Sequence, residues 1–152
     1  MRRLAWQVRG ISDRMWDAKR VLNWLAGSFA GFAGDLFLKR AFLFINMLHL
    51  KFGMFDESEI SSWPIPADYQ VPNVMRTLGM LCYSPELAGM IKQGTQIPRM
   101  SGMEVEIRAA TVIVGKMLHE ASGLSTARID ASLWSMRKAC HFPHHLTVTT
   151  DY

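Results

Sequence analysis

The stretch "SGMEVEIRAATVIVGKMLHEASG", residues 101–123, carries the clearest helical signal in the sequence. Ser101 and Glu104 form the S-x-x-E capping box that typically begins a helix. Gly123 follows the last apolar position, where glycine commonly ends one. Between these signals the apolar residues recur at the three- and four-residue spacing of one helix face, at Ile107, Ala110, Val114, Met117 and Leu118. The stretch therefore predicts an amphipathic α-helix that packs one side against a core.

The same spacing recurs on both sides of this stretch. It predicts further helices over 13–26, with Asp13 as the cap, and over 36–52, 71–82, 84–94 and about 130–139. Residues 27–35 and 53–70 are expected to be a break and a long irregular loop. The tail 141–152 is expected to form a short strand or an extended arm. Because strands do not alternate with helices, we predict a single all-α domain over 1–152.

Composition and charge limit the kinds of partner that the chain can have. The sequence is 49% apolar and 20% charged, with a formal net charge of +4, which is typical of a globular protein. No run of five like charges occurs, so a polybasic nucleic-acid arm is not expected. The apolar stretch 36–50 contains Lys39 and Arg40 and is too short to cross a bilayer, and the basic start lacks the apolar run of a signal peptide. Cys82 and Cys140 have no regular spacing, which favours free thiols and a cytoplasmic location.

The stretch "PADYQVPNVMR", residues 66–76, places Asp68 just before a predicted helix. The positive end of a helix favours an ionised carboxylate, and a fixed anion could stabilise the positively charged sugar that forms when a glycosidic bond breaks. Alternatively, Asp68 accepts hydrogen bonds from backbone donors at the helix entry. Spacing alone favours this second, structural interpretation.

Two further clusters contain candidate binding residues. Asp130 and Trp134 are four residues apart and share a helix face, where an acid and an indole could hold a flat heterocycle. Alternatively, Asp130 caps its helix and Trp134 belongs to the core. Glu104 and Arg108 have the spacing of a helical ion pair, whereas Glu106 either contacts a ligand N–H or lies exposed on the helix flank.

The stretch "CHFPHH", residues 140–145, contains residue types that bind metals. Pro143 interrupts any helix there, and no second ligand pair with finger spacing is present. We therefore predict no metal site and no cofactor.

Taken in order, "LFLKRAFLF", "PADYQVPNVMRTLGMLCYSPELAGMI", "EVEIRAATV", "IDASLW" and "FPHHLTVTTDY" resemble the C-terminal half of the queuosine salvage protein family. The resemblance covers about residues 36–152, whereas residues 1–35 form a weakly matched N-terminal helix and loop. It implies an all-helical fold similar to helix–hairpin–helix DNA glycosylases. It also implies an N-glycosylase that releases the base queuine from queuosine 5′-phosphate.

The resemblance also implies roles for individual residues. Asp68 is then the catalytic carboxylate, and Asp130 and Trp134 line the pocket for the 7-deazaguanine base. The two most specific motifs add the remaining substrate-binding candidates, which are Ala67, Tyr69, Glu106 and Arg108.

The chain departs from the family pattern in three ways. Gln70 stands where members have a basic residue, and Asn73 stands where they have a glutamine. Members are also considerably longer, and their N-terminal half has no counterpart here. The alternative is therefore a truncated binding module or split subunit for a deazapurine, a nucleic acid or a protein. Five tryptophans and eleven methionines in a short chain further predict self-association or a partner that supplies the missing half.

Overall fold

A computed structural model describes residues 17–152, and this part of the chain is all-α, as predicted. Its helices in chain order are α2 (Ala18–Ser28), α3 (Ala30–Ala33), α4 (Lys39–Phe52), α5 (Glu57–Ile60), α6 (Gln70–Thr77), α7 (Pro85–Lys92), α8 (Gly102–Ser122), α9 (Thr126–Ser135) and the 3₁₀ turn η1 (Met136–Ala139). No β-strand occurs in residues 17–152, although one isolated parallel bridge joins Gln96 to Leu146. The similarity to helix–hairpin–helix DNA glycosylases stays a prediction.

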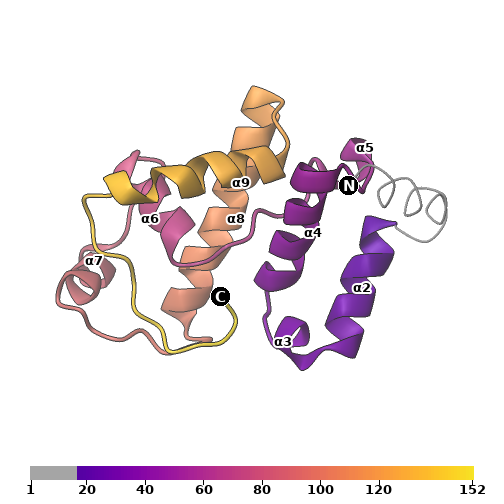
Figure 1. Ribbon diagram of the computed structural model, residues 1–152. Coiled ribbons are helices and arrows are strands. Elements are labelled where there is room, and N and C mark those ends of the chain that lie inside the picture. Colours follow the sequence, from indigo (N-terminus) through magenta and orange to yellow (C-terminus); the bar gives the residue numbers. More distant parts are fainter. Residues whose placement is uncertain (1–16) are drawn as a thin grey trace.

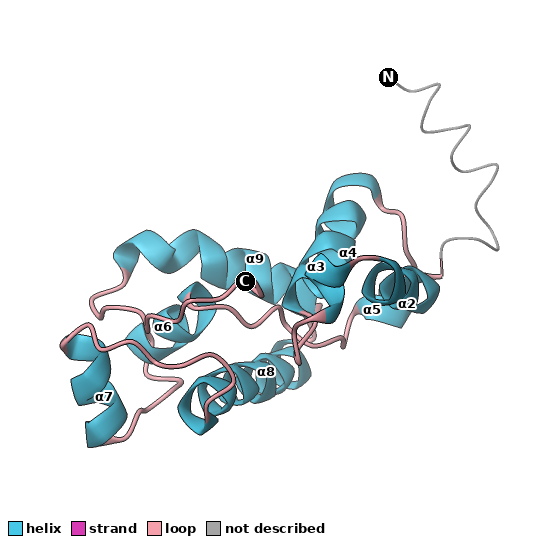
Figure 2. Ribbon diagram, turned by 90° about the horizontal axis from the view of Figure 1, so that it is seen from below, coloured by secondary structure: helices cyan, strands magenta, loops and turns pink. Residues whose placement is uncertain are grey.

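The helices form two groups that lie side by side (Figure 1). Helices α2, α4 and α5 enclose one apolar cluster, in which Ala18, Val21, Leu25, Ala41, Ile45, Phe55 and Ile60 are buried. Helices α6, α8 and α9 enclose a second cluster, in which Ile65, Val71, Val74, Met75, Leu81, Ile129 and Leu133 are buried. Helix α7 packs against α8 through a smaller third cluster. The tail runs past α7 and returns toward the junction of the two groups (Figures 1 and 2).

The predicted caps of α7 and α8 are confirmed. The Ser84 hydroxyl accepts from Leu87 N at 3.2 Å, and the Ser101 hydroxyl accepts from Glu104 N at 3.4 Å. Gly123 ends α8 in the left-handed conformation, with φ of 69°. The other half of the capping box is shifted by one residue, because the Glu104 carboxylate accepts from Met100 N.

Several predicted boundaries were wrong. Residues 27–35 include the short helix α3, and residues 53–70 include α5, each too short to show helical periodicity. The last helix begins at Thr126 rather than near 130, so Asp130 lies inside α9 and does not cap it. Asp17 caps α2, whereas the predicted cap Asp13 lies outside the described residues.

Helix α8 passes very close to the segment that leads into α6. A Cβ atom at Gly115 would lie 2.6 Å from Ile65 Cγ2, and Ile65 is fully buried. Gly115 therefore permits this approach because it has no side chain. The contact fixes the segment that carries Asp68 against α8.

Gly115→Ala is expected to lower the stability by about 1–3 kcal/mol, because the added methyl group displaces a side chain that has no room to move. The measurement is the midpoint of chemical unfolding. Gly89→Ala is the matched control, since Gly89 lies inside α7 with no atom within 4 Å of the added Cβ. It should gain roughly 0.5–1 kcal/mol from helix propensity. Equal gains for both variants would contradict the close approach.

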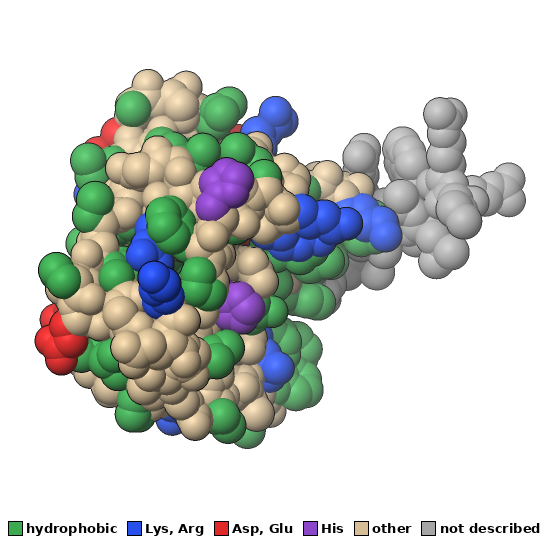
Figure 3. Space-filling view, turned by 90° about the vertical axis from the view of Figure 1, so that its left-hand side faces the viewer, with side chains coloured by type: hydrophobic (Ala, Val, Ile, Leu, Met, Phe, Trp, Pro, Cys, Tyr) green, Lys and Arg blue, Asp and Glu red, His purple; other side chains and the backbone are tan. Residues whose placement is uncertain are grey.

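Exposed apolar side chains occur on both groups of helices. On the first group they include Trp24, Phe29, Phe44, Met47, Leu50 and Phe52, which are between 41% and 61% exposed. On the side of α6 and α7, polar atoms and basic and histidine side chains separate the apolar ones (Figure 3). Among residues 17–152, no helix is both long and apolar enough to span a membrane.

Candidate active site

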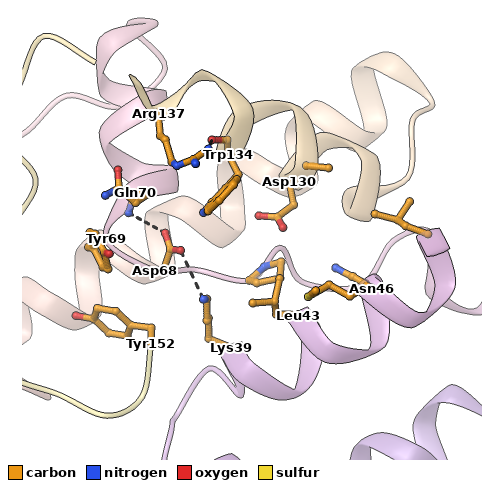
Figure 4. Close-up of a pocket in the computed structure, with 14 residues that line it drawn as sticks. Lys39, Leu43, Asn46, Asp68, Tyr69, Gln70, Asp130, Trp134, Arg137 and Tyr152 are labelled. Carbon is orange, nitrogen blue, oxygen red and sulfur yellow. Dashed lines mark hydrogen bonds and ion pairs between the residues drawn. The ribbon is translucent and has the colours of Figure 1, made fainter. Parts of the chain in front are cut away.

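A cavity of about 520 Å³ lies where the two groups of helices meet. One wall is a face of α4, and the opposite wall comes from α9 (Figure 4). The segment 66–69 before α6 and the side chain of Tyr152 line the space between these walls. The lining residues are Lys39, Leu43, Asn46, Met47, Leu50, Pro66, Asp68, Tyr69, Gln70, Asp130, Ala131, Trp134, Arg137 and Tyr152. Apolar walls with a few convergent charged groups are typical of a site for a small ligand.

The two carboxylate oxygens of Asp68 have different partners. Oδ1 accepts hydrogen bonds from Gln70 N at 2.8 Å and Val71 N at 2.9 Å, so it satisfies the first free donors of α6. Oδ2 lies 3.6 Å from Lys39 Nζ, and Figure 4 shows this ion pair at the edge of the cavity. The structural role is therefore observed for one oxygen, whereas the other oxygen faces Lys39.

Lys39 is the first residue of α4, and its position is fixed by the turn that precedes it. Leu38 has a left-handed backbone with φ of 47°, which is strained for a residue with a side chain. The carboxylate of Asp35 stabilises the turn by accepting from Phe37 N and Lys39 N at 3.1 and 2.7 Å. These hydrogen bonds therefore hold the backbone of Lys39 in place beside the cavity.

Arg108 joins these elements from behind the cavity. Its guanidinium is fully buried and donates to Asp35 at 2.7 Å, to Glu104 at 3.2 Å and to the Ala67 carbonyl at 3.0 Å. Burial alone would raise the pKa of Asp35, but the hydrogen bonds from Arg108 and the backbone lower it overall. Arg108 thus holds the start of α4 and the residue before Asp68 in one network.

Asp130 points into the cavity from the middle of α9, near Asp68 and Lys39 (Figure 4). Burial, together with the negative charge of Asp68, raises the pKa of Asp130 from 3.8 to about 7, and Lys39 opposes the shift. A carboxyl group with this pKa exchanges its proton near neutral pH, so a cationic or N–H donor ligand can favour its ionised form.

Asp130→Asn is expected to change the pH dependence of stability. Between pH 4 and 7, folded Asp130 keeps a proton that the unfolded chain releases, so wild-type stability falls as pH rises through this window. The variant does not lose stability in this way. The melting temperature of the variant minus that of wild type should therefore be several degrees larger at pH 8 than at pH 5. Thermal melts at both pH values measure this difference. An equal difference at both would show that Asp130 titrates normally.

Trp134 is held by a neighbouring arginine. The Arg137 guanidinium lies 3.3 Å from the centre of the Trp134 ring and donates to the Trp134 carbonyl at 3.0 Å. Because Trp134 is 45% exposed, it is not a core residue, and that alternative was wrong. The indole borders the cavity and can cover a flat ring.

The C-terminal tail brings Tyr152 to the cavity. Arg99 donates to the Asp151 carboxylate at 2.7 Å and to the Gly34 carbonyl at 2.7 Å, which ties the tail to the loop before α4. Tyr152 then lies 6.2 Å from the Tyr69 ring, centre to centre, and its hydroxyl is 3.2 Å from His145 Nε2. Long-range contacts of this kind leave no signal in local sequence spacing.

The structure brings together four of the predicted site residues, which are Asp68, Tyr69, Asp130 and Trp134. Ala67 and Arg108 lie buried behind the cavity and do not line it. Glu106 is exposed on α8, as one of its two interpretations predicted. Sequence reasoning missed Lys39, Asn46, Arg137 and Tyr152, although Lys39 belongs to the quoted stretch "LFLKRAFLF". Within residues 17–152, no group of three or more histidine, cysteine, aspartate or glutamate side chains could hold a metal ion.

Residues 17–152 form a small all-helical structure with a cavity that is lined by two carboxylates. Comparison with protein families gives a more specific result, because the family model described as "Queuosine salvage protein" matches residues 16–152. The chain belongs to this family.

Curated relatives agree with this assignment. The chain is 37% identical over 129 residues to a queuosine 5′-phosphate N-glycosylase/hydrolase of Dictyostelium discoideum, covering 76% of this chain and 40% of the relative. It is 34% identical over 130 residues to a protein of the same name from Sphaerobacter thermophilus, covering 76% and 39%. A Schizosaccharomyces pombe protein of that name is 31% identical over 90 residues, covering 57% and 25%. The chain therefore matches well under half the length of these relatives.

Proposed function

We propose that the chain acts in queuosine salvage as an N-glycosidic hydrolase that releases queuine from queuosine 5′-phosphate. The observation that carries this proposal is the Asp68 oxygen beside Lys39 in a cavity that also contains Asp130 and Trp134. The membership of the chain in the family and the printed names of its relatives support the same reaction.

In the proposed reaction, the bond between the sugar C1′ and the base nitrogen breaks, and the bonding electrons leave with the base. Positive charge then builds on the sugar ring, where Asp68 Oδ2 stabilises it. Water adds to C1′ and gives up a proton, and the departing base takes up a proton. The ionised carboxylate needs no rearrangement during the reaction, because two backbone donors and Lys39 already hold it.

The base is proposed to lie between α4 and α9. Trp134 would cover one face of the ring, while Asp130 would accept from the secondary amine of queuine. Tyr69 borders the same cavity and is the remaining proposed contact from the "ADY" motif. Ala67 and Arg108 support the site from behind, so any effect of these two residues on the substrate would be indirect.

A second candidate function is a binding module or split subunit without catalysis of its own. The observation in its favour is the exposed apolar surface of α2–α4, where Trp24 and Phe29 pack edge to face with ring centres 5.2 Å apart. A second copy or a partner chain could cover this surface and complete the cavity. The chain covers only 40% of the Dictyostelium relative, so this candidate needs its own test.

Incubation of the purified chain with queuosine 5′-phosphate, followed by chromatography for free queuine, distinguishes the two functions. Release of queuine at a rate proportional to protein concentration supports the hydrolase. Queuine binding without release would instead support the binding module. Light scattering of the same sample shows whether the chain associates with itself.

A further inference from the structure

Asn46 is a buried polar side chain for which the described residues provide no partner. It lies on α4 and is 2% exposed, and neither Oδ1 nor Nδ2 hydrogen-bonds any other group in residues 17–152. A buried amide without partners destabilises the folded protein, so such side chains are rare unless a ligand supplies the missing hydrogen bonds.

Asn46 lies at the cavity, so a bound ligand can supply the missing hydrogen-bond partners. Asn46 is itself a lining residue, on the same face of α4 as Leu43 and Leu50. Figure 4 shows its amide on the cavity side of the helix, below Asp130. Within residues 17–152, the other buried side chains with unpaired atoms are His49, Asn73, Ser125, Thr126 and Thr147, and none of these lines the cavity.

We propose that Asn46 is a specificity-determining residue whose amide recognises the polar edge of the bound base. This inference rests on the proposed function, because it assumes that the cavity binds a base. It adds a contact that the proposed roles of Asp68, Asp130 and Trp134 do not supply.

The chemistry of the amide defines the class of ligand. An amide offers N–H donors and a carbonyl acceptor side by side, so its complement is a ring edge with an adjacent carbonyl and N–H group. The lactam edge of a 7-deazaguanine has this arrangement. Asn46 Nδ2 donates to the ring carbonyl and Asn46 Oδ1 accepts from the neighbouring N–H, which leaves Asp130 for the secondary amine. The amide reaches the ligand by turning about its terminal side-chain torsion, which is broad and soft in asparagine.

The test compares two free bases that differ only at this edge. 7-Deazaguanine carries the carbonyl and N–H groups, whereas 2-amino-7-deazapurine keeps the 2-amino group and lacks them. The wild-type chain is expected to prefer 7-deazaguanine by calorimetry. Asn46→Leu keeps a similar volume without polar atoms, so it should reduce this preference roughly tenfold, as expected for a buried hydrogen bond. Equal weakening of both ligands would show that Asn46 only shapes the cavity, and would overturn the inference.

Two further measurements separate this inference from its alternatives. The ligand-free Asn46→Leu variant should melt at the same temperature as wild type or above it, because no hydrogen bond is removed. A fall of several degrees would mean that the amide is satisfied within the fold, and would overturn the inference. Leu43→Met is the control in the same wall and should leave the ratio of the two affinities unchanged.

The outcomes also distinguish this inference from the proposed function. A preference for 7-deazaguanine that depends on Asn46, without cleavage of queuosine 5′-phosphate, would support the base-reading role, in which Asn46 recognises the edge of the base. It would overturn the proposed hydrolase function. Cleavage with an unchanged preference in Asn46→Leu would support the hydrolase and overturn the base-reading role. Failure of the wild-type chain to bind either base would overturn the base-reading role as well.

Discussion

Asp68→Asn is expected to lower the rate of queuine release by about 10²–10³-fold, the usual effect of removing a preorganised electrostatic partner from a transition state. Asparagine keeps a carbonyl oxygen that can still accept from Gln70 N and Val71 N. At the position of Oδ2 it places an NH₂ group, which brings no negative charge to the sugar and does not attract Lys39. Single-turnover kinetics with queuosine 5′-phosphate measure the loss, and calorimetry with queuine should show nearly unchanged binding of the base.

The cap and the charge of Asp68 can be separated with two comparison variants. Asp68→Ala removes both, so it should reduce turnover and also destabilise α6 by about 0.5–2 kcal/mol. Asp56→Asn makes the same chemical change at the exposed cap of α5, where Asp56 accepts from Ser58 N outside the cavity, and should leave turnover unchanged. If Asp68→Asn melts several degrees below wild type while turnover persists, Asp68 is a structural cap and its catalytic role is excluded.

The all-α fold and the best helices could be predicted because their signals are local. The caps at Ser84 and Ser101 and the apolar face of α8 depend only on residues within a few positions of one another. Helices α3 and α5 have four residues each, which is too short for periodicity to appear. The burial of the Glu104–Arg108 pair was also not predictable from its spacing, since most pairs at this spacing are exposed.

The candidate site could be predicted only in part, because local patterns indicate only residues that are close together in the sequence. Asp68 and Tyr69 share one motif, and Asp130 and Trp134 share one helix face, so local patterns indicated each pair. The cavity forms only when α4 packs beside α9, and nothing local shows that Asn46 faces Asp130 across it. Tyr152 reaches the cavity through the tail, which Arg99 holds from 52 residues away in the chain. Recognising such contacts requires the packed structure.

Arg108→Leu is expected to destabilise the chain by about 3–5 kcal/mol, the usual cost of removing one partner from a buried ion pair. The guanidinium is fully buried, and its loss leaves Asp35 and Glu104 without their charge partner in a region with little access to water. For a domain of this size, the melting temperature should fall by roughly 10 °C or more. Chemical unfolding monitored by circular dichroism measures the free energy directly.

Lys116→Leu is the matched control, because Lys116 and Glu120 have the same four-residue spacing on the same helix but are 72% and 60% exposed. Loss of the Lys116–Glu120 ion pair should change the free energy of unfolding by less than about 1 kcal/mol. The destabilisation in Arg108→Leu should also shrink as the pH falls toward 4, since without Arg108 the pKa of Asp35 rises and the carboxyl can take up a proton. A loss that stays constant between pH 4 and 8 would point to lost packing against Phe37 and Tyr152 instead of lost charge.

The same variant also tests whether the network positions the cavity. Arg108 donates to the Ala67 carbonyl, and through Asp35 it reaches the first turn of α4, so it fixes both sides of the Asp68–Lys39 pair without lining the cavity. Arg108→Lys keeps one charge but loses the planar fork that makes three contacts at once. It should therefore recover part of the stability while turnover stays low. Full recovery of turnover by lysine would show that a buried charge is sufficient and that the geometry of the fork does not matter.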